Sequence, residues 1–132
     1  MLKLGLIGCG GMGSHHARVF GKMPNVSVAG VCDIVEEKAR KVGQDLDTKW
    51  CVDYRDLLGD VDAVWVCTEP FNRLEIVTTS TKAGKHVFAE KPICLSLEDA
   101  DQMIAAAEDA NVKFMLGYVL RFRNPYKLMH DT

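Results

Sequence analysis

Short apolar runs alternate along this chain with stretches in which apolar residues recur at helical spacing. The runs are rich in valine, leucine and isoleucine and stop at glycine or polar residues, a pattern typical of strands buried on both faces. They predict six strands, at residues 2–8, 26–32, 50–52, 61–67, 85–89 and 112–118. Helices are expected between them, at residues 12–23, 35–46, 54–58, 72–83 and from 96 onward, and a last helix is expected from 126.

This alternation predicts the fold class. Strands that alternate with helices form βαβ units with right-handed crossovers, and such units build a parallel sheet covered on both faces. A chain of 132 residues is the size of one ordinary domain. We therefore expect a single α/β domain with a doubly wound, six-stranded parallel sheet, the architecture that carries two mononucleotide-binding halves.

Composition and charge exclude several classes of protein. Hydrophobic residues make up 48% of the chain and charged residues 26%, as in ordinary globular domains. A formal net charge of −2 argues against nucleic acid or an anionic membrane as a partner. The chain has no apolar run of roughly 18 residues and no signal-peptide pattern at its start, so a cytoplasmic location is expected. The five cysteines are scattered without a CxxC pair, which predicts neither a disulfide framework nor a metal site.

A glycine cluster follows the first predicted strand. The sequence Gly8-Cys9-Gly10-Gly11-Met12-Gly13 matches G-x-G-x-x-G between a strand and a helix. In that setting Gly8 permits a tight turn, Gly10 lets the backbone approach a pyrophosphate, and Gly13 lets the helix pack closely on the strand. The position within a regular strand–helix alternation excludes a flexible linker. The hexamer alone is explained equally well by a glycine-rich turn.

Asp33 shifts that balance toward a dinucleotide site. It directly follows the second predicted strand, twenty positions after Gly13, where a carboxylate can accept hydrogen bonds from ribose hydroxyls. The alternative is that Asp33 is the N-cap of the next helix. Asp33 would repel a 2′-phosphate and no arginine follows it directly, so NAD is favoured over NADP.

Glu90-Lys91-Pro92 comes directly after the fifth predicted strand. Ligands of doubly wound sheets bind outside the carboxyl ends of the strands, so this tripeptide would line the cofactor crevice. The Lys91 ammonium could there hydrogen-bond a substrate hydroxyl or carbonyl and relay its proton. The spacing alone favours a surface turn that holds a solvated ion pair over such a role.

Several segments together resemble a known family. In chain order, GLIGCGGMGSHHA, VCD, AGKHVFAEKPICLSLEDA and FMLGYVLRFRNPY look like the N-terminal half of the glucose–fructose oxidoreductase/inositol dehydrogenase (Gfo/Idh/MocA) family. The resemblance runs through nearly the whole chain, and its AGKHV…EKP block is more specific than the glycine motif. It implies an NAD-binding Rossmann domain in which Lys91 positions the substrate and takes part in proton transfer. The cofactor-binding residues that it implies are Gly8, Gly10, Gly11, Met12, Gly13, Asp33, Cys67, Thr68, Glu90 and Lys91.

The chain departs from the family pattern in two places. Where the family often reads T-P-x-x-x-H, this chain has Thr68-Glu69-Pro70-Phe71-Asn72-Arg73, which leaves the local contacts of Arg73 open. The family also carries a C-terminal substrate domain, which we expect to be absent from residues 1–132. The expected division is a dinucleotide-binding domain at 1–123 and the start of a crossover helix at 124–132.

These observations predict the NAD(H)-binding half of an oxidoreductase. The expected reaction transfers hydride between nicotinamide and a secondary alcohol of a sugar, inositol or related polyol, in a parent protein expected to be a homo-oligomer. The alternative is an isolated nucleotide-binding module without turnover. His15 and His16, in the first turns of the first helix, are interpreted as packing or exposed residues and not as metal ligands.

Overall fold

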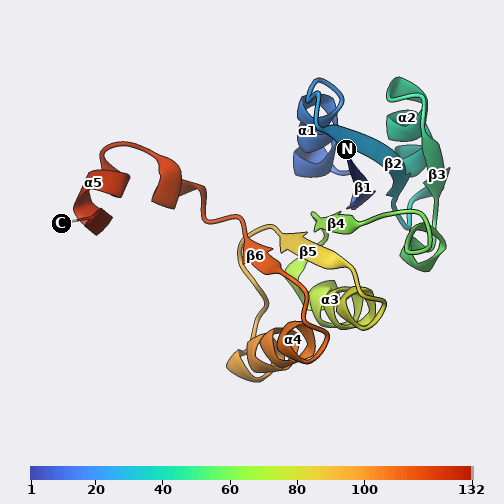
Figure 1. The fold of residues 1–132 in the computed structure, drawn as a ribbon. Coiled ribbons are helices and arrows are strands. Elements are labelled where there is room, and N and C mark those ends of the chain that lie inside the picture. The colour runs from blue at the N-terminus through green and yellow to red at the C-terminus, as the bar shows by residue number, and fades with distance from the viewer. Residues whose placement is uncertain (132) are drawn as a thin grey trace.

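The computed structural model describes residues 1–131 and contains one six-stranded sheet (Figure 1). All adjacent strands pair in parallel, in the order β3-β2-β1-β4-β5-β6. The strands are β1 (Leu2–Ile7), β2 (Val26–Cys32), β3 (Lys49–Cys51), β4 (Ala63–Val66), β5 (His86–Ala89) and β6 (Phe114–Leu116). The helices are α1 (Gly11–Phe20), α2 (Glu36–Asp45), α3 (Arg73–Lys82), α4 (Leu97–Asp109) and α5 (Tyr126–Asp131), with short 3₁₀ helices η1 (Tyr54–Leu57), η2 (Pro70–Asn72) and η3 (Val119–Phe122). The expected doubly wound α/β fold is confirmed.

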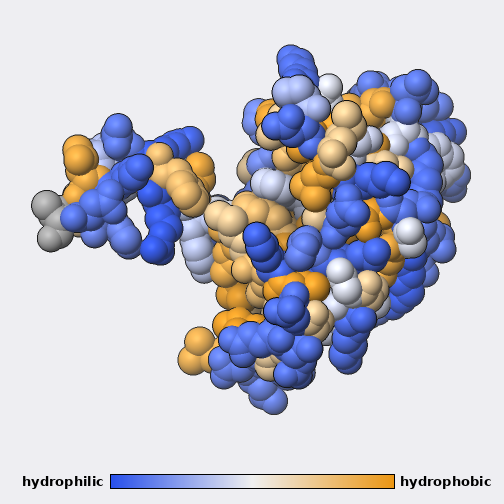
Figure 2. Space-filling view, viewed as in Figure 1, coloured by the Kyte–Doolittle hydropathy of each residue, from blue (hydrophilic) through white to orange (hydrophobic). Residues whose placement is uncertain are grey.

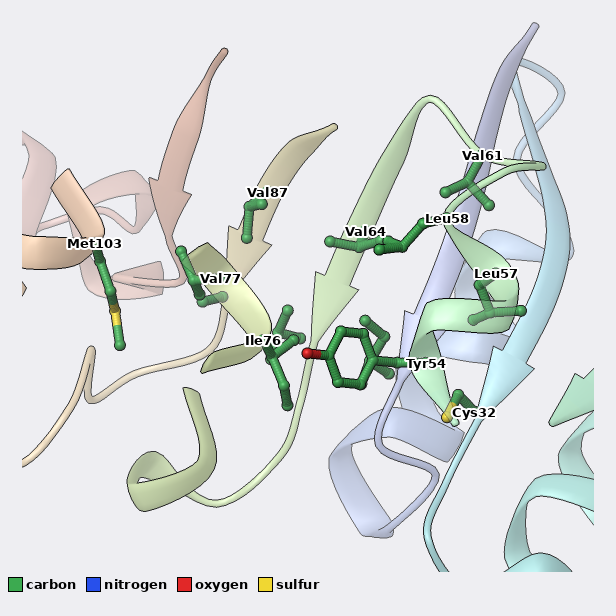
Figure 3. Packing of buried hydrophobic residues seen from close by; sticks show 13 residues of the cluster. Cys32, Tyr54, Leu57, Leu58, Val61, Val64, Ile76, Val77, Val87 and Met103 are labelled. Atoms are coloured by element: carbon green, nitrogen blue, oxygen red, sulfur yellow. The ribbon is translucent and has the colours of Figure 1, made fainter. Parts of the chain in front are cut away.

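Helices cover the two faces of the sheet in two groups. In Figure 1, α1 and α2 lie beside β1–β3, while α3 and α4 lie beside β4–β6. Side chains alternate across β1, so Leu6 packs into one apolar cluster with Ala17 and Val42, and Ile7 packs into the other. Figure 3 shows the larger cluster, in which residues of β4, β5, η1, α3 and α4 meet. Strand order reverses between β1 and β4, which is the switch point where such sheets bind ligands.

Several elements are shorter in the structure than the sequence predicts. β4 and β6 are shorter than the apolar runs that predicted them, and the segment at 54–58 is a 3₁₀ helix with Asp53 accepting a hydrogen bond from Arg55 N. In α4, Met103 and Ala107 are buried, whereas Leu97 is 86% exposed because it lies at the edge of the apolar stripe.

The end of the described chain leaves the sheet. After β6 the chain passes through η3 into α5, which lies apart from the other helices (Figure 1). Figure 2 shows this segment as a separate lobe with apolar as well as polar side chains, and Phe122 and Tyr126 are among its exposed residues. The helix predicted from 126 is therefore present, and residue 132 lies outside the described residues. Within the described chain, no helix has the length and apolar character to cross a membrane.

Candidate cofactor and active site

The carboxyl ends of β1, β2, β4 and β5 bring most of the predicted site residues to one edge of the sheet. Backbone hydrogen bonds continue the strand pairing just past these ends, from Gly8 N to Cys32 O at 2.8 Å and from Cys67 N to Ile7 O at 2.7 Å. Glu90 N likewise donates to Val66 O at 3.0 Å. The glycine loop, the β2 end and the loops after β4 and β5 thus meet around the switch point.

Two of the glycines are required by close packing. Gly8 has a φ of +100°, and a Cβ added there would lie 2.9 Å from the Cys67 carbonyl carbon. A Cβ on Gly13 would lie 1.8 Å from Gly8 O. The first glycine therefore turns the chain against β4, and the last lets α1 sit directly on the turn.

The two glycines between them face open space. A Cβ on Gly10 or Gly11 would meet no atom within 4 Å, and Gly10 is the N-cap of α1 without a side-chain cap hydrogen bond. No side chain therefore covers the first N–H groups of α1 at Gly10 and Gly11, and the neighbouring Met12 is 54% exposed. Unpaired N–H groups and the positive end of the helix dipole make this loop a cradle for phosphate, so the residues present fit a dinucleotide.

Asp33 links this cradle to the end of β2. Its Oδ2 accepts a hydrogen bond from Cys9 N and its Oδ1 accepts one from Val35 N, both at 2.8 Å. The interpretation of Asp33 as the N-cap of α2 is wrong, because α2 begins at Glu36 and Val35 is its N-cap. Each carboxylate oxygen keeps a lone pair for a further donor, as a ribose hydroxyl would require.

The loop after β4 contributes two of the predicted residues. Thr68 Oγ1 is buried without a hydrogen-bond partner among the described atoms, so it is a group that a bound ligand could satisfy. Burial, and next the nearby Glu90 carboxylate, raise the pKa of the Cys67 thiol to about 12. Cys67 therefore stays protonated at neutral pH and lines this loop as a neutral side chain.

Glu90 pairs with His16, a residue for which the sequence predicts only a packing or exposed role. His16 Nε2 lies 2.7 Å from Glu90 Oε1, and the two side chains are only 19% and 13% exposed. The His16 ring also lies 5.0 Å from the Trp65 ring and stacks on Phe20 at 5.8 Å. His16 is separated from Glu90 by 74 positions, so no local motif joins them. One signal in the sequence pointed to this pair: in a doubly wound fold the first turns of α1 lie near the carboxyl ends of the strands, where Glu90 also lies.

His16, Cys67 and Glu90 also form a candidate metal-binding group. One ligand atom from each lies within 4.8 Å of the others. Two of the three already share the 2.7 Å hydrogen bond, and the high pKa of the Cys67 thiol opposes formation of the thiolate that binds metals. The chemistry of the group therefore favours a hydrogen-bonded pair beside a neutral thiol.

Lys91 is solvent-exposed and lies between two residues whose backbone is fixed by Arg73. The Arg73 side chain is buried, with 3% exposure. Its Nε and Nη2 donate to Thr68 O at 3.1 and 2.7 Å, and its Nη1 donates to the carbonyls of Glu90 and Pro92. Arg73 thus binds the backbone of the loops after β4 and β5, a role that its sequence position did not reveal.

Comparisons with known proteins agree with this geometry. The sequence model of the Gfo/Idh/MocA oxidoreductases, described as an NAD-binding Rossmann fold, matches residues 2–118. The chain is 33% identical to myo-inositol 2-dehydrogenase of Thermotoga maritima over 99% of its own length and 40% of that protein.

Solved structures show the same similarity. UDP-N-acetylglucosamine 3-dehydrogenase from Acidithiobacillus ferrooxidans superposes with a TM-score of 0.91 at 28% identity, over 98% of this chain and 42% of that one. Scyllo-inositol dehydrogenase from Lactobacillus casei, with bound NAD(H) and scyllo-inositol, superposes with a TM-score of 0.90 at 29% identity, over 99% of this chain and 40% of that one. The chain therefore spans about 40% of the length of these relatives.

Proposed function

Because the chain belongs to the Gfo/Idh/MocA oxidoreductase family and forms its NAD-binding Rossmann domain, we propose that it is the cofactor half of a polyol or sugar dehydrogenase. The reaction is hydride transfer between nicotinamide and a secondary alcohol carbon. One observation carries this proposal: the bare helix N-terminus at Gly10 and Gly11 lies in the same loop that Asp33 joins to β2. This pairing of a phosphate cradle with a ribose acceptor is what a dinucleotide requires.

The residues of the cradle hold the cofactor in this proposal. The N–H groups of Gly10, Gly11, Met12 and Gly13 face the pyrophosphate, with Gly8 as the turn that directs them. Asp33 accepts hydrogen bonds from the adenosine ribose through the lone pairs that Cys9 and Val35 leave free. The carboxylate at that position disfavours a 2′-phosphate, which supports NAD over NADP.

The loops after β4 and β5 hold the reacting end. Thr68 supplies a hydroxyl and Cys67 a neutral wall on the nicotinamide side, while Glu90 and Lys91 border the substrate. The bound nicotinamide supplies the hydride acceptor or donor. Lys91 holds the substrate oxygen by a hydrogen bond and takes up or returns its proton as the carbon changes oxidation state.

The names of the relatives support the substrate class. By these names, the relatives act on inositols or on a nucleotide sugar, and each of these compounds carries secondary alcohols. The choice among such polyols belongs, in this proposal, to the portion that the longer relatives carry beyond the matched region. We propose the same boundary as the sequence suggests, with residues 1–123 as the cofactor domain and 124–132 as the start of a crossover.

Two experiments test the proposal. Titration of the chain with NADH should show saturable binding that is lost in Asp33→Ala, and no binding at millimolar NADH would contradict the cofactor assignment. In a full-length protein that carries this chain, Lys91→Ala should lower kcat by at least about 100-fold. If the chain binds NADH but Lys91→Ala keeps its full kcat, the assignment of Lys91 fails. If the full-length protein binds NADH and turns over no polyol, the alternative of a nucleotide-binding module is favoured.

A further inference from the structure

Arg73 occupies a position that is unfavourable for an arginine. It is the first residue of α3, where the positive end of the helix dipole repels a cation. Its guanidinium is also almost fully removed from water, and burial lowers the Arg73 pKa from its ordinary value. A buried cation at a helix N-terminus persists only when other interactions compensate for both effects.

Backbone carbonyls provide that compensation. Four hydrogen bonds from the guanidinium end on three carbonyl oxygens, those of Thr68, Glu90 and Pro92. The first carbonyl belongs to the loop after β4 and the other two to the loop after β5. The planar fork of arginine can reach both loops at once, whereas an ammonium group or an imidazole has fewer donors and a different geometry.

The two carbonyls on the β5 side flank Lys91. The Glu90 carbonyl precedes Lys91 and the Pro92 carbonyl follows it, and the same Nη1 holds both. The Lys91 side chain itself remains exposed and therefore free to reach a ligand. The position of the Lys91 backbone is thus set by Arg73 relative to Thr68 and the end of β4.

We propose that Arg73 is a positioning residue that holds Lys91 in register with the nicotinamide side of the site. The inference deepens the proposed function and rests on it for the role of Lys91. Direct contact of Arg73 with substrate or cofactor is opposed by its burial, since only 3% of the residue is exposed. Neutralisation by Glu90 is a weaker explanation, because that carboxylate already binds His16.

Arg73→Lys is the informative variant, because it keeps the charge and loses the fork. Arg55→Lys is the matched control, since Arg55 is an exposed arginine whose ion pair with Glu75 also involves α3. Hydrogen exchange of the backbone amides, followed by NMR in this chain, measures how firmly Arg73 holds the loop after β5, and it does not require turnover. We expect the Glu90 amide, which donates to Val66 O, to exchange at least about tenfold faster in Arg73→Lys. The amides of Gly8 and Ser14, which donate to Cys32 O and Gly10 O, should stay within twofold of wild type. Arg55→Lys should leave both loops unchanged.

Two results would overturn the positioning role of Arg73. One is a Glu90 amide that exchanges at the wild-type rate in Arg73→Lys. The other is an equal increase at Glu90 and in the glycine loop, which would mark a general loss of stability. If Arg73→Lys does not fold, the wild-type chain still decides the question. A held guanidinium gives separate Nη resonances that exchange slowly with water, and a single averaged signal would contradict the proposal.

Kinetics of the full-length protein separate this inference from the proposed function. Arg73→Lys should lower kcat about 10- to 100-fold while the KM for NADH stays within twofold, because the cradle does not depend on Arg73. A rise in KM for NADH with unchanged kcat would contradict the positioning role. A wild-type protein without dehydrogenase activity would defeat the proposed function, while the exchange rates would still decide whether Arg73 holds the loop.

Discussion

The two ends of the candidate site are built in different ways. At the glycine loop the backbone forms the surface, and side chains are excluded at Gly8 and Gly13 because other backbone atoms occupy their place. After β4 and β5, side chains from distant segments hold the loops, as Arg73 does for the backbone and His16 does for Glu90. The first end is encoded within one hexamer, and the second depends on the complete fold.

The largest expected effect of a single change is at Gly13. In Gly13→Ala the new Cβ would lie 1.8 Å from Gly8 O, so the helix or the turn must move. We expect a loss of about 3 kcal/mol or more in the free energy of unfolding, measured by urea denaturation. Gly59→Ala is the control, because a Cβ there meets nothing within 4 Å. Equal stability of the two variants would show that the glycine loop is not packed as described.

The buried thiol inside the same hexamer makes stability depend on pH. Burial, with Asp33 as a second cause, raises the pKa of Cys9 to about 12 from 9.0. Above pH 9 the unfolded chain loses this proton while the folded chain keeps it, so rising pH favours unfolding. The free energy of unfolding of wild type should fall more steeply than that of Cys9→Ala between pH 9 and 11, by about 1.4 kcal/mol per pH unit. Parallel curves would contradict the burial of this thiol.

A smaller effect is expected where the cradle joins β2. Asp33→Ala leaves the N–H groups of Cys9 and Val35 without their acceptor, which should destabilise the fold by about 1–2 kcal/mol. Asp33→Asn keeps one amide oxygen as an acceptor and should lose about half as much. Thermal denaturation compares the two variants. If neither differs from wild type, Asp33 is not the link between the cradle and the strand.

The smallest effect is expected at the end formed by side chains. His16→Gln removes the partner of Glu90 and one ring of the cluster with Phe20 and Trp65, which should cost about 1 kcal/mol of stability. NADH affinity at the cradle should change less than twofold. If the free energy of NADH binding falls by more than the free energy of unfolding, the glycine loop and the His16–Glu90 pair are energetically coupled, and their description as separately built ends is wrong.

Local patterns predicted what depends on neighbours in sequence. The alternation of strands and helices, the glycine loop and the position of Asp33 all follow from periodicity and short spacings, and the structure confirms the doubly wound parallel sheet that they imply. The contacts of His16 and Arg73 span 74 and up to 19 positions, and no periodicity encodes them. The N-cap interpretation of Asp33 failed because α2 begins three residues later, at Glu36, with Val35 as its N-cap. Contacts such as those of His16 and Arg73 become visible only when strand ends are placed side by side.

The most direct test of the account is calorimetric titration of the chain with NADH, comparing wild type with Gly10→Ser. Serine is a favoured N-cap, so Gly10→Ser should fold at least as stably as wild type. Its side chain enters the open space of the cradle and its hydroxyl competes for the N–H groups that would face phosphate, so NADH affinity should fall at least about tenfold. Gly59→Ser should bind as wild type does. Undiminished binding by a folded Gly10→Ser, or no binding by wild type, would contradict the central claim that this bare helix N-terminus holds the dinucleotide.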